Sequence, residues 1–156
     1  MPKTALLACI LERLRAEVDL LTRAALATHA EATHEENKAE DKYDTRGLEA
    51  SYLAHGQSRA AEEAAEAVAQ FQALPAREFQ PGEAIALGAL VRLDDGARYF
   101  VGPRAGGTEI EFEGDTLMVI TPSSPLGRQL VGRHQGDAIT LQLGPRRQER
   151  RIVSVL

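Results

Sequence analysis

The residues of this sequence best suited to chemistry are carboxylates in the segment THEENKAEDKYDTR, residues 33–46. Five of its fourteen residues are acidic and three are basic. Carboxylate oxygens are hard ligands, and one or two of them can recruit a Mg²⁺ ion that keeps several of its waters. Crowded carboxylates also repel one another unless a cation or a basic neighbour offsets the repulsion. Charge content alone favours a solvated turn, and a functional use of the crowded carboxylates is the alternative; the acidic candidates are Glu35, Glu36, Glu40 and Asp41.

No second group of residues predicts a catalytic or metal site. His29 and His34 are five residues apart, which is not the spacing of a zinc-binding pair on a helix. Cys9 lies beside a row of leucines, where we expect a buried and inert thiol. The segment PRAGG, residues 103–107, lacks the Lys-Ser/Thr pair of a phosphate-binding loop. We expect no cofactor, and no metal that the isolated chain would bind stably.

Two long helices are expected to position the acidic segment. From Lys3 to about Ala32 there is no Gly or Pro, and apolar residues recur at steps of four and three. A second segment, from about Tyr43 to Leu74, contains no proline and has an alanine-rich apolar face. The simplest arrangement of two such helices is an antiparallel hairpin with the acidic segment at its tip. The apolar row that this hairpin should bury consists of Leu7, Leu11, Leu14, Val18, Leu21 and Ala25.

The second half of the chain predicts a small β domain. Two prolines end the helical pattern, and short, β-branched segments separated by Gly-containing turns follow them. One short helix is expected over residues 124–132, with Ser124 as its N-cap and Pro125 at its first position. The fold class is therefore α+β, with a long antiparallel coiled coil over residues 1–76 followed by a β domain over residues 82–156.

Composition and charge narrow the class of protein. The 156 residues are 44% hydrophobic and 26% charged, which is typical of folded domains. The single cysteine excludes an internal disulfide and fits a reducing cytoplasm, and no apolar segment approaches the roughly 20 residues of a membrane span. The net charge of −5 lies entirely in residues 1–80, since residues 81–156 hold nine basic and nine acidic residues. This balance argues against a general nucleic-acid binder.

The last part of the sequence, VITPSSPLGRQLVGRHQGDAITLQLGPRRQERRIVSVL, resembles the C-terminal domain of the bacterial Gre transcription elongation factors. The matching pattern is Ser-Pro-Leu-Gly-Arg at 124–128, then Leu130, then Gly136-Asp137, a strand, a Gly-Pro turn and a final strand. RYFVG at 98–102 is similar to the strand that precedes this region in the family. The order of the two parts also matches, so the resemblance covers nearly the whole chain.

The resemblance implies an FKBP-like fold for the β domain and a definite partner. Gre factors bind RNA polymerase core at the rim of its secondary channel and insert the helical hairpin. Acidic tip residues then help to hold a second Mg²⁺ ion of the polymerase active centre, which promotes cleavage of backtracked RNA. The implied setting is transcription elongation and DNA binding, with indirect contact to nascent RNA and no enzyme activity of the chain itself. The implied docking residues are Ser124, Pro125, Leu126, Gly127, Arg128, Arg133 and Asp137.

The tip departs from the family pattern Asp-x-x-Glu-Asn-Ala-Glu-Tyr. If Glu36-Asn37 is aligned with the Glu-Asn of the pattern, Thr33 occupies the Asp position. If Tyr43 is aligned with the Tyr, Ala39 occupies the Glu position. Either alignment retains one acidic residue of the pair, and neighbouring lysines would partly repel a cation. We therefore expect polymerase binding with weak or absent stimulation of RNA cleavage.

Two alternatives stay open. One is a non-cleaving polymerase-binding regulator, similar to the short-hairpin regulators of nucleoside diphosphate kinase, although the hairpin expected here is longer. The other is a coiled-coil interaction module or chaperone-like protein unrelated to polymerase. The sequence leaves the oligomeric state open, with a monomer as the simplest case. The basic residues that would face acidic polymerase surface or RNA, or form a solvated rim, are Arg128, Arg133, Arg146, Arg147, Arg150 and Arg151.

Overall fold

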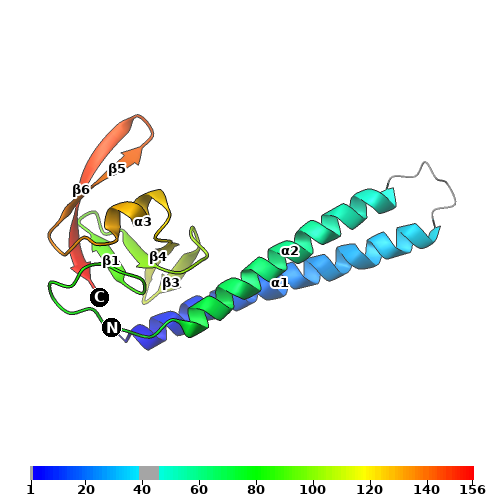
Figure 1. Cartoon of the computed structure of the whole chain (residues 1–156), viewed down its shortest axis with the longest axis horizontal. Coiled ribbons are helices and arrows are strands. Elements are labelled where there is room, and N and C mark those ends of the chain that lie inside the picture. Colours follow the sequence, from blue (N-terminus) through cyan, green and yellow to red (C-terminus); the bar gives the residue numbers. More distant parts are fainter. Residues whose placement is uncertain (1, 39–45) are drawn as a thin grey trace. The chain divides into compact units, whose positions relative to one another are not determined.

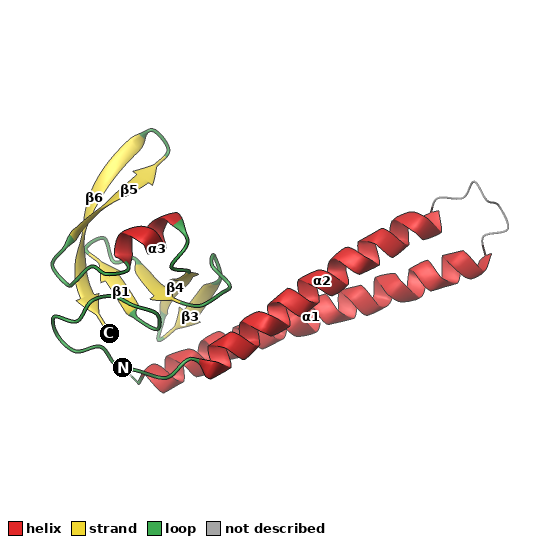
Figure 2. Ribbon diagram, in the orientation of Figure 1, coloured by secondary structure: helices red, strands yellow, loops and turns green. Residues whose placement is uncertain are grey.

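The computed structural model describes residues 2–38 and 46–156, with side chains described for 2–31 and 55–156. Two long helices precede a six-stranded mixed sheet and a third, short helix (Figure 1; Figure 2). The predicted α+β order is confirmed. The elements are α1 (Lys3–Lys38), α2 (Arg46–Ala73), β1 (Leu90–Leu93), β2 (Arg98–Val101), β3 (Glu109–Phe112), β4 (Asp115–Ile120), α3 (Pro125–Leu130), β5 (Ala138–Leu143) and β6 (Arg146–Val155).

The chain forms two compact units, and each long helix belongs to both. Residues 12–69 make one unit, and residues 1–11 together with 70–156 make the other. The start of α1 and the end of α2 therefore belong with the sheet. One contact that joins them to it is the stacking of Phe71 on Phe100 of β2, with ring centroids 6.1 Å apart. No helix in the described part of the chain is long and apolar enough to cross a membrane.

The unit of residues 12–69 contains α1 and α2 side by side (Figure 1). The apolar row of α1 is buried at Leu7, Leu14 and Ala25, each with at most 7% of its surface exposed. The expectation that the whole row is buried is wrong at three positions, because two helices alone cannot enclose a side chain on every side. The partly buried members of the row are Leu11, Val18 and Leu21.

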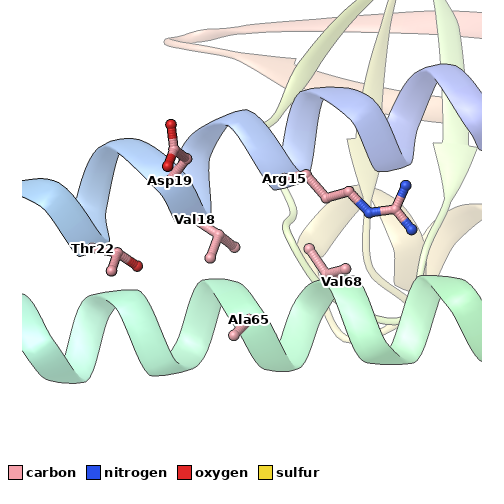
Figure 3. Close-up of a pocket in the computed structure, with 6 residues that line it drawn as sticks. All are labelled: Arg15, Val18, Asp19, Thr22, Ala65 and Val68. Carbon is pink, nitrogen blue, oxygen red and sulfur yellow. The ribbon is translucent and has the colours of Figure 1, made fainter.

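A groove of about 290 Å³ lies between these two helices. Val18 of α1 and Val68 of α2 point into the space between the helices, as Figure 3 shows. Ala65 of α2 is too small to fill that space. We interpret the groove as incomplete packing between a leucine-rich and an alanine-rich helix. Its remaining lining residues are Arg15, Asp19 and Thr22.

Burial of Leu14 predicts its contribution to stability. This side chain is 3% exposed, so Leu14→Ala should lower the free energy of unfolding by about 2–5 kcal/mol through lost burial and a residual cavity. Urea unfolding followed by circular dichroism measures the loss. Leu20→Ala is the matched control, because Leu20 is 69% exposed and its truncation should change stability by less than about 0.5 kcal/mol. Equal losses for the two variants would contradict the burial of Leu14.

The sheet has the strand order β3-β4-β2-β1-β6-β5. The β2 and β4 strands pair in parallel, and all other neighbours pair antiparallel. The α3 helix packs beside β5. One apolar cluster of the unit includes aliphatic side chains from five of the six strands and from α3; it consists of Phe79, Ile85, Ala89, Val91, Leu93, Val101, Ile120, Leu130, Ile139, Ile152 and Val155. Further buried side chains of the unit lie outside this cluster, among them Leu6, Ile10, Phe71, Phe100, Ile110 and Leu117.

The first turn of α1 places a buried lysine against this sheet. Lys3 is 5% exposed, and its Nζ donates a hydrogen bond to the backbone oxygen of Gly88 at 2.9 Å and another to that of Leu156. The same ammonium lies 5.5 Å from the ring centroid of Phe79 and 5.9 Å from that of Phe100. Two carbonyl oxygens and two aromatic faces thus replace part of the water that the cation loses on burial.

Burial of Lys3 also predicts a dependence of stability on pH. Burial lowers the pKa of Lys3 from 10.5 to about 8, with Glu78 acting in the opposite direction. Between these values the folded chain has released the Lys3 proton and the unfolded chain has kept it. The unfolded state then binds more protons, so the free energy of unfolding rises with pH on account of this group.

The Lys3→Met variant tests this dependence. We expect the wild type to gain stability relative to Lys3→Met as the pH rises from about 8 to 10, because the variant has no proton to lose at this site. Denaturant unfolding of both proteins across this range measures the difference, and every other titrating group cancels in the comparison. A constant difference over the whole range would contradict the lowered pKa.

Candidate functional site

The Ser-Pro-Leu-Gly-Arg motif forms α3 and its N-terminal cap. The Ser124 hydroxyl accepts a hydrogen bond from the Gly127 backbone N–H at 3.0 Å and donates one to the Thr121 oxygen at 2.7 Å. Pro125 occupies the first turn, where backbone N–H groups have no partner within the helix, so the N–H that proline lacks costs no helical hydrogen bond. Gly127 has no room for a side chain, because a Cβ there would lie 1.8 Å from the Thr121 oxygen. The predicted N-cap and first-turn proline are confirmed.

The α3 helix buries one side and exposes the other. Leu130 is fully buried, and the partly buried Leu126 packs against the core cluster. Arg128 is exposed, as is Pro125. Val131, the C-cap residue, has 38% of its surface exposed. The exposed side of α3 therefore combines apolar surface with one guanidinium group.

The loop after α3 extends this exposed side. The Arg133 side chain is exposed, while its backbone oxygen accepts a hydrogen bond from the Ile85 N–H at 2.8 Å. The Asp137 carboxylate accepts a hydrogen bond from the His134 N–H at 2.8 Å and closes its own turn. The backbone oxygen of Asp137 also accepts a hydrogen bond from the Ile152 N–H at 2.9 Å, which joins the turn to β6. Asp137 thus shapes the loop that presents Arg133.

The seven predicted docking residues divide into two groups. Four shape the surface through hydrogen bonds, close packing or burial, and three present exposed side chains. Within the described residues, neither exposed arginine has an ion-pair partner, so both guanidinium groups are available to a carboxylate of another molecule. The shaping residues are Ser124, Leu126, Gly127 and Asp137; the exposed residues are Pro125, Arg128 and Arg133.

The acidic tip candidates are only partly covered by the structure. Glu35 and Glu36 belong to α1, but their side chains lie outside those described. Glu40 and Asp41 lie outside the described residues altogether. Where side chains are described, no three His, Cys, Asp or Glu residues are grouped to hold a metal ion. The cation-directed tip therefore stays a prediction.

Two other side chains differ from what the sequence suggests. Cys9 is partly buried, and its Sγ lies 3.4 Å from the backbone oxygen of Glu111. Burial of Lys3 was not predicted; its position one turn before Leu6 and Leu7, on the apolar side of α1, is the one signal of it in the sequence. Neither residue lies on the exposed surface around α3, so neither changes the composition of the candidate site.

Comparison with known proteins gives one clear sequence relationship. No family model matches the chain. The chain is 31% identical over 124 residues to the transcription inhibitor protein Gfh1 of Thermus thermophilus, which covers 76% of this chain and 75% of that protein.

Solved structures of Gfh1 are also similar to the chain. A crystal structure of GreA factor homolog 1 (Gfh1) of Thermus thermophilus is 24% identical, covers 94% of both chains and has a TM-score of 0.39. Gfh1 of Thermus aquaticus is 23% identical, covers 92% of both chains and has a TM-score of 0.36. At such TM-scores the superpositions carry no weight of their own, and the sequence relationship is the stronger finding.

Proposed function

The chain belongs to the family of GreA/GreB-like transcription factors, and we propose that it binds RNA polymerase core at the secondary channel and restrains transcription. The observation that carries this proposal is the 31% identity, over about three quarters of both chains, with a family member named as a transcription inhibitor. In this proposal the chain is an accessory of the polymerase, without catalytic activity of its own.

We assign docking to the exposed surface around α3 in an FKBP-like β unit. Pro125 and Val131 supply apolar contact, while Arg128 and Arg133 supply positive charge without an internal partner. Planar guanidinium groups bind carboxylates through paired hydrogen bonds. The matching polymerase surface is therefore acidic, and charge attraction accelerates the encounter more than it strengthens the final complex.

We assign occupation of the channel to the α1–α2 hairpin, as a coiled-coil arm. Its acidic segment would lie near the Mg²⁺ ions of the polymerase, which bind hard oxygen ligands. Cleavage of backtracked RNA needs a second metal ion to be held in place. One acidic residue of the family pair is missing here, and Lys38 and Lys42 oppose the cation. The arm therefore fills the channel without efficient recruitment of a second Mg²⁺, which suits an inhibitor.

Reversing the charge at the docking surface should weaken polymerase binding. We expect Arg128→Glu/Arg133→Glu to bind core polymerase about tenfold more weakly at low salt, mainly through a slower association rate. Surface plasmon resonance across a salt series measures both rates. Arg92→Glu/Arg104→Glu is the matched control, because both residues are exposed and the change in net charge is the same.

The outcomes of this binding experiment also test the proposed function as a whole. If both double variants bind like the wild type, the docking surface is misplaced. If the wild type itself does not bind purified core polymerase, the proposed function is wrong and an interaction module with another client replaces it.

A stalled, backtracked elongation complex with labelled RNA tests the acidic tip. With Mg²⁺ present, we expect the wild type to raise the intrinsic cleavage rate less than about twofold, since one acidic residue of the metal-holding pair is absent. Lys38→Gln/Lys42→Gln should raise cleavage, because it removes two positive charges from the tip. Robust cleavage by the wild type that is lost in Glu36→Gln and Asp41→Asn would show a cleavage factor instead.

A further inference from the structure

The two edges of the sheet carry opposite charge. Residues 109–115, from β3 into β4, contain four acidic and no basic residues. Residues 146–151, the first part of β6, contain four arginines and one glutamate. The strand order places these two segments at opposite ends of the sheet. The net charge of residues 81–156 is therefore zero although one edge of the sheet is acidic and the other is basic.

The basic edge is a two-stranded ribbon that extends beyond the rest of the sheet (Figure 1). Only residues 152–155 of β6 pair with β1, while 146–151 pair with β5 alone. Gly144 and Pro145 join the two strands. The φ of +62° at Gly144 is the value that a type II′ turn requires at its first central residue. The ribbon thus reaches away from the core with a tight turn at its end.

Polar contacts join the ribbon to the neighbouring turn and to α3, and one further contact lies within the ribbon. The Arg150 Nε lies 3.1 Å from an Asp95 carboxylate oxygen, and its Nη2 donates to the Gln148 side chain at 2.6 Å. On the other strand, the Thr140 N–H donates to the Gln129 side chain of α3 at 3.1 Å. A two-stranded ribbon is marginal on its own in water, so these contacts stabilise it. Less conformational entropy is then lost when the ribbon binds a partner.

The end of the ribbon exposes apolar and basic groups together. The apolar row of β5 leaves the core here, because Ile139 is 3% exposed, Leu141 is partly buried and Leu143 is 56% exposed. Leu143 lies directly opposite Arg146 in the register, so the two side chains share one face. Arg147 lies on the opposite face, where its Nε donates a hydrogen bond to the side chain of its cross-strand neighbour Gln142 at 3.2 Å. Among the described residues, no carboxylate forms an ion pair with Arg146 or Arg147.

We propose that the end of the ribbon, with Leu143 and Arg146 on one face and Arg147 on the other, forms a second docking site, which binds an acidic, partly apolar segment of RNA polymerase. This site rests on the proposed function and is separate from the residues of the α3 surface. Protein interfaces are enriched in arginine, and the exposed leucine beside it adds apolar surface that a protein partner can bury. A nucleic acid backbone offers no apolar surface to Leu143, and the net charge of −5 disfavours one as partner.

The test uses the full chain and purified core polymerase. Arg146→Glu/Arg147→Glu should bind about tenfold more weakly at low salt, and the loss should shrink as salt is raised from about 50 to 300 mM. Leu143→Ser should weaken binding about threefold to tenfold at every salt concentration, because the lost contact is apolar. Arg92→Glu/Arg104→Glu is the charge-matched control. Circular dichroism and thermal unfolding check that each variant folds.

The possible outcomes separate this inference from the proposed function. If the wild type binds core polymerase and both ribbon variants bind equally well, the ribbon is not a docking site, while the proposed function stands. If the ribbon variants keep their polymerase affinity but lose affinity for labelled duplex DNA or single-stranded RNA, the partner is a nucleic acid and the inference is overturned. If the wild type does not bind polymerase, both proposals fail. Should the glutamates disturb the ribbon, Arg146→Gln/Arg147→Gln removes the charge with similar side chains and should give a smaller loss.

Discussion

Burial of the Lys3 ammonium is the constraint on which the start of the helical region depends. A cation taken out of water needs acceptors, and here they are the backbone oxygens of Gly88 and Leu156. These oxygens come together because Leu90 and Leu156 exchange a pair of backbone hydrogen bonds, at 2.9 Å each, beside β1 and β6. The first turn of α1 therefore packs where the pairing of β1 with β6 brings these two oxygens together.

The same requirement, that polar groups be satisfied, explains the sequence motif around α3. The Ser124 hydroxyl accepts a hydrogen bond from the Gly127 N–H and donates one to the Thr121 backbone oxygen, and the absence of a side chain at Gly127 leaves room for that oxygen. The Asp137 carboxylate accepts a hydrogen bond within its own turn. These residues fix the fold around α3 locally. In the proposed function, recognition of the partner falls to neighbouring exposed side chains such as Arg128.

Charge is distributed by structural element. The acidic excess lies in the residues of the helical hairpin, whereas the β-rich half is neutral in total and divided between an acidic and a basic edge. In the proposed complex with RNA polymerase, this separation of charge lets each surface attract a polymerase surface of opposite charge. In the proposed function, attraction at the docking surfaces acts on polymerase binding, and the composition of the acidic segment acts on RNA cleavage.

The sequence by itself determined the features that depend on near neighbours. Periodicity indicated two long helices and a series of short strands, and Ser124 marked the start of α3. The helix α1 continues to Lys38, beyond the expected end near Ala32, in a stretch without Gly or Pro from Lys3 to Arg46. Only the tertiary structure decided the burial of Lys3, the stacking of Phe71, the parallel pairing of β2 with β4 and the extended ribbon. The first three depend on segments that are not neighbours in the chain, and local pattern carries no information about which of them will meet: Lys3 contacts Gly88 and Leu156, Phe71 contacts Phe100, and β2 pairs with β4. The ribbon is a local hairpin of β5 and β6, but its extension beyond the sheet depends on β1, which pairs only with residues 152–155 of β6.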